Sequence, residues 1–191
     1  MPNPSSFQRI IAFLTLGVGL IAVGVASMTL ITLRQSQLAD QSATNEFSTT
    51  PAKVDYPAPA LVLTDLDGNP VALTDYLGQT LLVNMWATWC PPCREEMPTL
   101  QAFYNDYSAQ GFVLIGLNDG ETEAQVREFV DRYGLAFPIW LDPEYASETA
   151  FKTMNLPSSF VIDRSGQVRL QWVGAISRPM LDEYVAPIIE E

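Results

Sequence analysis

The feature that most constrains this chain is an uncharged apolar run near its start. From Ile10 to Leu33 the sequence carries 24 consecutive residues without a charge, and Arg9 and Arg34 bracket them. As an α-helix rising about 1.5 Å per residue, the run would extend roughly 36 Å, enough to cross the hydrocarbon core of a bilayer. We therefore expect residues 10–33 to form a transmembrane helix, preceded by a short N-terminal segment at residues 1–9.

A cleaved signal peptide is the main alternative for this run. Such peptides have a shorter apolar stretch that ends at a small-residue cleavage site. The local match to such a site is Val25–Ser27, and the apolar run continues past it. The length of the run favours an uncleaved anchor.

The residues after the run divide into a polar linker and a globular domain. Residues 34–57 are rich in Ser, Thr, Ala and Pro and show no apolar periodicity, which predicts a flexible linker. Residues 58–191 are long enough for one ordinary hydrophobic core and too short for two. We expect them to fold as one domain.

Acidic residues dominate the part of the chain after Arg34. All 22 Asp and Glu residues lie there with eight of the ten Lys and Arg residues, which gives that part a formal charge of −14. Nucleic acid and anionic lipid both bind cationic surfaces, so neither is an expected partner. Solubility is the simplest explanation of the sign of the charge.

Strand and helix patterns alternate along the domain. Apolar runs on either side of Asp67-Gly68 predict a hairpin, and the nearly continuous apolar run at 80–87 predicts a buried central strand. Apolar spacing predicts a helix at 93–110. Further along we expect a strand at 112–117, a helix after a Thr122–Gln125 capping box, a strand at 137–141, a helix at 145–154, strands at 159–163 and 168–173, and a last helix from Ser177 that Pro187 should end or kink. This order predicts an α/β sandwich with a central mixed sheet and flanking helices.

Both cysteines of the chain, Cys90 and Cys93, lie in a W-C-P-P-C motif at the junction of the central strand and its helix. As a structural disulfide the pair would close a very short loop, the kind that stabilises least. As a metal site it offers two thiolates in a chain without histidine or a third cysteine. A C-x-x-C pair at the amino end of a helix, where the dipole favours thiolate, is typical of a redox pair. The redox interpretation is the favoured one of the three.

The stretch "NMWATWCPPCREEMP" and the later "LPSSFVID" resemble the thioredoxin superfamily. They are most similar to its membrane-anchored thiol:disulfide oxidoreductases of the TlpA, ResA and cytochrome c biogenesis type. The similarity covers about Ala58 to Ile189 and implies a thioredoxin-like fold. It also implies that Cys90 is the exposed nucleophile that forms a mixed disulfide with a client protein, and that Cys93 resolves it.

The resemblance assigns three further residues to client binding. Pro157 matches the cis-proline that faces the redox pair in this superfamily, and the backbone of Leu156 matches the segment that pairs with an extended client. Trp89, directly before Cys90, is a candidate for an apolar rim beside the sulfur, with plain packing as an equal alternative.

Two positions depart from ordinary thioredoxin. Asn84 stands where thioredoxin has a buried aspartate that handles the proton of the second thiol, and an amide cannot do this. Glu96 lies three residues after Cys93 and matches a glutamate of the membrane-anchored subgroup. Our hypothesis is that Glu96, with a pKa raised by partial burial, exchanges the proton of Cys93. The alternative is an exposed helix glutamate like its neighbour Glu95.

The two prolines between the cysteines bear on the direction of the redox reaction. Pro91 and Pro92 have no backbone N–H with which to stabilise a thiolate at Cys90. Weak thiolate stabilisation favours the disulfide form, which predicts a reducing pair.

The expected function is that of a membrane-anchored thiol:disulfide oxidoreductase that reduces disulfides in client proteins, without a metal or cofactor. Its domain would lie on the extracytoplasmic side of a bacterial-type inner membrane, or in an equivalent lumen, with residues 1–9 in the cytoplasm. The resemblance implies disulfide-bearing protein clients, apocytochrome c first among them, and an upstream thiol protein as electron donor. The alternatives are a disulfide-forming oxidase and a non-catalytic assembly factor that holds a client. A peroxidase is disfavoured because the residues before Cys90 lack the peroxiredoxin pattern.

Overall fold

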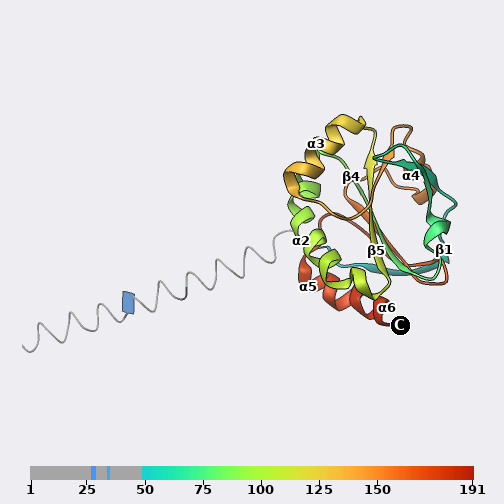
Figure 1. Cartoon of the computed structure of the whole chain (residues 1–191). Coiled ribbons are helices and arrows are strands. Elements are labelled where there is room, and N and C mark those ends of the chain that lie inside the picture. The colour runs from blue at the N-terminus through green and yellow to red at the C-terminus, as the bar shows by residue number, and fades with distance from the viewer. Residues whose placement is uncertain (1–26, 29–33, 35–48) are drawn as a thin grey trace, which may run out of the picture. The chain divides into compact units, whose positions relative to one another are not determined.

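The computed structural model describes residues 27–28, 34 and 49–191 (Figure 1). The expected anchor lies outside the described residues except for Ser27 and Met28, as do residues 1–9 and most of the expected linker. Within the described ranges, no helix is long and apolar enough to cross a membrane.

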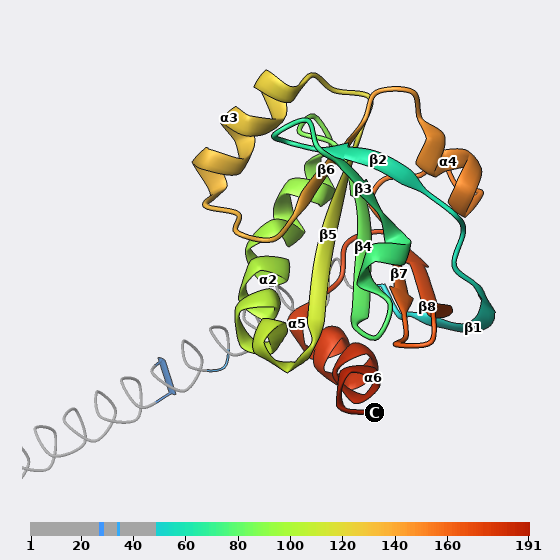
Figure 2. The same cartoon turned by 45° about the vertical axis from the view of Figure 1, so that its right-hand side comes forward.

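A mixed sheet of eight strands forms the centre of the domain (Figures 1 and 2). The strands are β1 (Ala52–Pro57), β2 (Val62–Asp65), β3 (Pro70–Ala72), β4 (Thr80–Trp86), β5 (Phe112–Asp119), β6 (Ile139–Asp142), β7 (Ser158–Ile162) and β8 (Gln167–Val173). Their order across the sheet is β1-β8-β7-β4-β5-β6-β2-β3. Strands β4, β5 and β6 run parallel, and the remaining neighbours pair antiparallel. All seven residues of β4 are buried, which confirms the predicted central strand.

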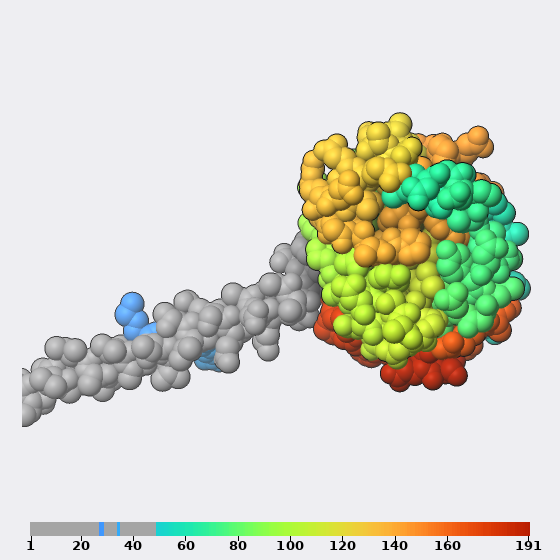
Figure 3. All heavy atoms as spheres, viewed as in Figure 1, coloured from blue at the N-terminus to red at the C-terminus, as the bar shows by residue number. Residues whose placement is uncertain are grey.

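Helices cover both faces of this sheet. They are η1 (Leu73–Tyr76), α2 (Pro91–Tyr107), η2 (Ser108–Gln110), α3 (Glu123–Tyr133), α4 (Ala146–Phe151), and the contiguous α5 (Arg178–Met180), η3 (Leu181–Val185) and α6 (Ala186–Glu190). Helices α2 and α3 and the C-terminal helical segment share one buried apolar cluster with β4, whereas η1 and α4 contribute to the other (Figure 2). Figure 3 shows α2 and α3 side by side on the surface of the domain. The expected thioredoxin-like sandwich is confirmed.

Strand β1 corrects the predicted linker. Residues Ala52–Pro57 pair antiparallel with β8 instead of continuing the linker to residue 57. Lys53 and Asp55 are exposed, whereas Val54 and Tyr56 are half-buried against the second core cluster. The prediction was wrong because this alternation is only four residues long and continues a Ser-, Thr- and Pro-rich segment, so it was counted with the linker. Its backbone hydrogen bonds with β8 hold it in place.

The effect of Pro187 also differs from the prediction. The C-terminal helical segment continues through Pro187 to Glu190. The turn before it widens, and the N–H of Ala186 donates to the carbonyl oxygen of Leu181, five residues earlier. A π-type turn of this kind accommodates a proline, which lacks the N–H for the regular helical bond.

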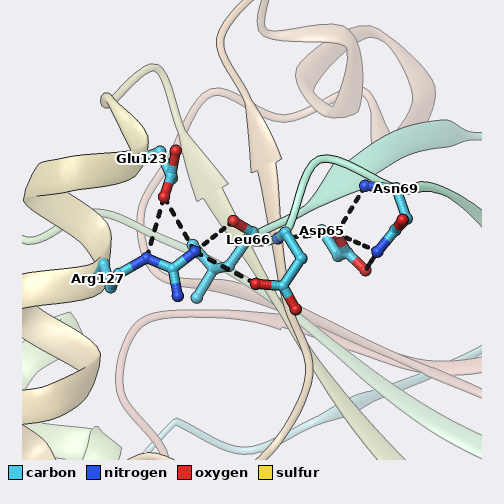
Figure 4. Close-up of polar contacts among 6 residues, drawn as sticks. Asp65, Leu66, Asn69, Glu123 and Arg127 are labelled. Carbon is cyan, nitrogen blue, oxygen red and sulfur yellow. Dashed lines mark hydrogen bonds and ion pairs between the residues drawn. The ribbon is translucent and has the colours of Figure 1, made fainter.

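Helix α3 is tied to the β2–β3 turn by Arg127 (Figure 4). Its guanidinium donates to the carbonyl oxygen of Leu66 and lies 2.9 Å from Glu123 and 3.4 Å from Asp67. Within the turn, Asp65 accepts hydrogen bonds from the backbone and side chain of Asn69. These contacts hold the start of α3 at the end of the sheet where β4 and β5 terminate.

Candidate active site

The redox pair lies where β4 ends and α2 begins. Cys90 is the N-cap residue of α2, and a disulfide joins it to Cys93. The Sγ of Cys90 accepts a 3.3 Å hydrogen bond from the backbone N–H of Cys93. Cys90 is 3% exposed and Cys93 is fully buried, so in the disulfide form the expected exposure of Cys90 is not found. Cys90 is the less buried of the two, and its role as the nucleophile stays a prediction.

The segment before β7 has the backbone expected of a client-binding site. The Leu156–Pro157 peptide bond is cis, as the motif predicts, and the carbonyl oxygen of Pro157 accepts a 2.8 Å hydrogen bond from Gly174. The backbone of Leu156 forms no hydrogen bond with the described part of the chain. A cavity of about 440 Å³ lies beside this segment, lined by Asn155 and Val173 among others. Strand addition by a client at the backbone of Leu156 stays a prediction.

Trp89 lies on the surface next to Cys90. It is 67% exposed, which makes it one of the most exposed large apolar side chains of the described residues. Its position excludes the alternative of core packing. An indole exposed beside the redox pair offers a contact surface to a client.

Glu96 is buried, not exposed on the helix surface. It is 2% exposed, and its two carboxyl oxygens accept hydrogen bonds from Asn84 Nδ2 at 2.8 Å and from the backbone N–H of Ile176 at 3.2 Å. Burial raises the pKa of Glu96 to about 8, and the two hydrogen bonds lower it in part. The direction agrees with the prediction. With this pKa the Glu96 carboxyl group is mostly protonated at neutral pH, and its proton exchange with Cys93 stays a prediction.

Asn84 connects Glu96 to the strand that follows the cis-proline. In the β4–β7 register Asn84 lies opposite Ser159, and its Nδ2 donates to the hydroxyl oxygen of Ser159 at 2.9 Å. Both amide protons of Asn84 therefore have acceptors. Sequence reasoning identified Asn84 by its departure from thioredoxin and did not identify Ser159.

Glu121 is a residue of this region that sequence reasoning missed. Its carboxylate accepts hydrogen bonds from the backbone N–H and the hydroxyl of Thr88, and from the side-chain amide of Asn118 at 2.8 Å. Thr88 lies two residues before Cys90, so Glu121 fixes the loop that carries Trp89 and Cys90. The contact follows from the β4–β5 pairing, in which Trp86 lies opposite Asn118. No motif in the sequence indicates it.

Disulfide exchange is the chemistry that the pair offers. Its two sulfurs are bonded to each other at a helix N-terminus. Among the described residues, no group of three or more His, Cys, Asp or Glu side chains is arranged to hold a metal ion.

Comparisons with known proteins identify the family of the chain. The model of the AhpC/TSA family matches residues 54–171. The thiol-disulfide oxidoreductases ResA of Geobacillus kaustophilus and Bacillus anthracis are each 37% identical to the chain over 131 residues. The matches cover 69% of this chain and 75% and 76% of those proteins, respectively.

Solved structures give the same result for the fold. The thiol:disulfide interchange protein DsbE of Chlorobium tepidum superposes with a TM-score of 0.66 at 29% identity, covering 72% of this chain and 98% of that one. StoA of Bacillus subtilis, at 24% identity, shares the fold with a TM-score of 0.58 over 67% of this chain and 97% of its own. The chain therefore belongs to the AhpC/TSA family and is a thiol-disulfide oxidoreductase of the ResA and DsbE type.

Proposed function

We propose that this oxidoreductase works as a reductase of protein disulfides on the extracytoplasmic side of a membrane. The reductive direction of the reaction is inferred from the small number of hydrogen-bond donors to the Cys90 sulfur. Pro91 and Pro92 fill the first positions of α2, so the first backbone N–H of the helix belongs to Cys93, and this group contacts the Cys90 sulfur. A thiolate with one such donor is weakly stabilised, which favours the disulfide and makes the reduced pair a good electron donor.

The reaction transfers two electrons from the two cysteines to the client. The Cys90 thiolate attacks one sulfur of the client disulfide, and the other client sulfur leaves as a thiolate. The Cys93 thiolate then attacks Cys90 in the mixed disulfide and releases the second client thiolate. The client gains two thiols, and the chain ends with the Cys90–Cys93 disulfide, the form that the structure describes.

Glu96 serves both halves of this cycle. During resolution its carboxylate accepts the proton of Cys93. During re-reduction by a donor thiol, Cys93 leaves as a thiolate and takes a proton back. With a pKa of about 8, Glu96 holds that proton at neutral pH while the pair is oxidised. The protonated Glu96 is therefore ready to protonate the Cys93 thiolate when the disulfide is reduced again.

The anchor and the client complete the proposal. The uncharged run at residues 10–33 would hold the domain at a bacterial-type inner membrane, with residues 1–9 in the cytoplasm. The proposed clients are proteins with exposed disulfides, and apocytochrome c with its oxidised C-x-x-C-H site is the leading candidate. A second thiol protein would supply the electrons.

A trapping experiment tests the reductase and its client. A Cys93→Ser chain, reduced beforehand, is mixed with an oxidised C-x-x-C-H peptide and with a disulfide peptide of the same composition in scrambled order. We expect a stable mixed disulfide through Cys90 that forms faster with the first peptide, measured by intact mass. Equal rates would remove apocytochrome c as the preferred client, and no adduct with either peptide would contradict reductase activity. Cys90→Ser is the matched control and should form no adduct.

A further inference from the structure

A buried chain of hydrogen bonds runs from α2 through β4 to β7. Asn84 Nδ2 donates to Glu96 Oε1 at 2.8 Å and to Ser159 Oγ at 2.9 Å. Asn84 and Ser159 are fully buried, and Glu96 is 2% exposed. Ser159 lies two residues after the cis-proline Pro157. The chain therefore joins the proton-exchanging carboxyl to the strand that begins at the client-binding segment.

The Asn84 side chain is costly for the fold. Most of the other residues of β4 are apolar, and all of them are buried. The Oδ1 atom of Asn84 is buried and has no hydrogen-bond partner among the described residues. A buried polar atom without a hydrogen bond destabilises a fold, so an apolar side chain of the same size would suit the strand better. An amide at this position is explained by its two hydrogen bonds, to Glu96 and to Ser159.

We propose that Asn84 and Ser159 are positioning residues for Glu96. Asn84 holds the carboxyl group in place and stabilises its ionised form, and Ser159 holds the Asn84 amide in the rotamer that reaches Glu96. Neither touches the sulfurs through any contact of the structure. This inference rests on the proposed exchange of the Cys93 proton with Glu96 and assigns the residues that tune it.

Of the residues that the structure describes, only uncharged groups lower the pKa of Glu96 against the effect of burial. The groups that act on its carboxyl are Asn84 from β4 and the Ile176 N–H from the segment after β8, and both are uncharged. Within the described part of the chain, no charged side chain contributes to the shift of the Glu96 pKa. In the absence of an ion pair, hydrogen bonds that favour the ionised form oppose the effect of burial.

Titration of Glu96 in the oxidised full-length chain tests this proposal directly. The side-chain carboxyl carbon is followed by NMR with 13C-labelled glutamate and assigned through its loss in Glu96→Gln. Asn84→Leu removes the donor and leaves little room for water, so the Glu96 midpoint should rise by about one pH unit. Ser159→Ala is the milder variant and should raise the midpoint by a smaller amount.

The double variant separates positioning from an independent effect. If Ser159 acts through Asn84, Ser159→Ala shifts the Glu96 midpoint in the wild-type background and leaves it unchanged in the Asn84→Leu background. Ser158→Ala is the matched control, because Ser158 is an equally buried neighbour that donates to Asn155 instead. It should leave the midpoint unchanged.

Two results would overturn the proposal. One is an unchanged midpoint in both Asn84→Leu and Ser159→Ala; the other is a Ser159→Ala shift of the same size in both backgrounds. The titration needs no client and no turnover, whereas reduction of client peptides is a separate assay. A chain that fails to reduce peptides but shows the expected midpoints contradicts the proposed function and leaves the positioning role standing.

Discussion

Thr88 and Glu121 lie 33 residues apart in the sequence and are joined by two hydrogen bonds at the entrance to the redox pair. One carboxylate accepts both the backbone N–H and the hydroxyl of Thr88. Because Thr88 precedes the exposed Trp89 and Cys90, the proposed nucleophile, this contact fixes the loop that leads into the redox pair.

Replacement of Glu121 should loosen that loop. In Glu121→Ala the N–H and hydroxyl of Thr88 and the side-chain amide of Asn118 all lose their acceptor, which costs about 1–3 kcal/mol of stability. Displacement of Cys90 should also slow attack on a client disulfide by about tenfold. Urea unfolding and the rate of mixed-disulfide formation in the Cys93→Ser background measure the two effects. Glu123→Gln, an exposed change on α3, should have little effect on either, and equal losses in the two variants would contradict this account.

The buried Glu96 should make stability depend on pH. Its folded-state pKa of about 8 lies above its ordinary value of 4.5, so the folded chain binds more protons than the unfolded chain between these values. The free energy of unfolding should therefore fall as the pH rises through this window. Below the window Glu96 is protonated in both states, so it should not change the free energy of unfolding with pH. Urea unfolding between pH 5 and pH 9 should show this slope in the wild type and in Glu95→Gln. A slope that persists undiminished in Glu96→Gln would show that another group causes it.

Asp119 provides a second carboxyl group whose charge destabilises the fold. It is 6% exposed with an unpartnered Oδ1, and burial, with the charges of Glu148, Asp142 and Glu121, raises its pKa to about 6. Asp119→Asn should stabilise the chain by about 1–3 kcal/mol at pH 7.5, where Asp119 is ionised, and change little at pH 4. Thermal or urea unfolding at the two pH values decides this. A gain of the same size at both values would assign the effect to packing instead of charge.

Trp89 should matter for clients and not for the fold. Because it is 67% exposed, Trp89→Ala should change the free energy of unfolding by less than about 0.5 kcal/mol. The loss of its contact surface should lower kcat/KM for client peptides severalfold, mainly through KM. Leu77→Ala removes a similarly exposed apolar side chain, from a pocket that neither cysteine lines, and serves as the control. Equal kcat/KM in wild type and Trp89→Ala would exclude Trp89 from client binding.

The elements that the sequence predicted well are those with a local signal. The apolar run of β4, the turn at Asp67-Gly68 and the W-C-P-P-C motif each depend on neighbouring residues, and each is found as expected. The cis bond before Pro157 and the burial of Glu96 were predicted from family resemblance, since apolar periodicity alone gives no reason for either.

The features that were missed depend on pairing between distant segments. Strand β1 is a short edge strand with little local signal and is stabilised by β8, more than a hundred residues later. The contacts of Glu121 with Thr88 and of Asn84 with Ser159 follow from the registers of β4 with β5 and with β7. The continuation of the last helix past Pro187 needs a widened turn, which the apolar stripe of the helix does not indicate.

The equilibrium potential of the Cys90–Cys93 pair is the most direct measure of whether the chain is a reductase. The full-length chain is equilibrated in thiol-disulfide buffers of graded potential, and the reduced fraction is counted by alkylation and mass. Weak stabilisation of the Cys90 thiolate predicts a midpoint below about −230 mV, toward the value of thioredoxin. A midpoint near −120 mV, the range of the strong oxidant DsbA, would contradict the account and make the chain a disulfide-forming oxidase.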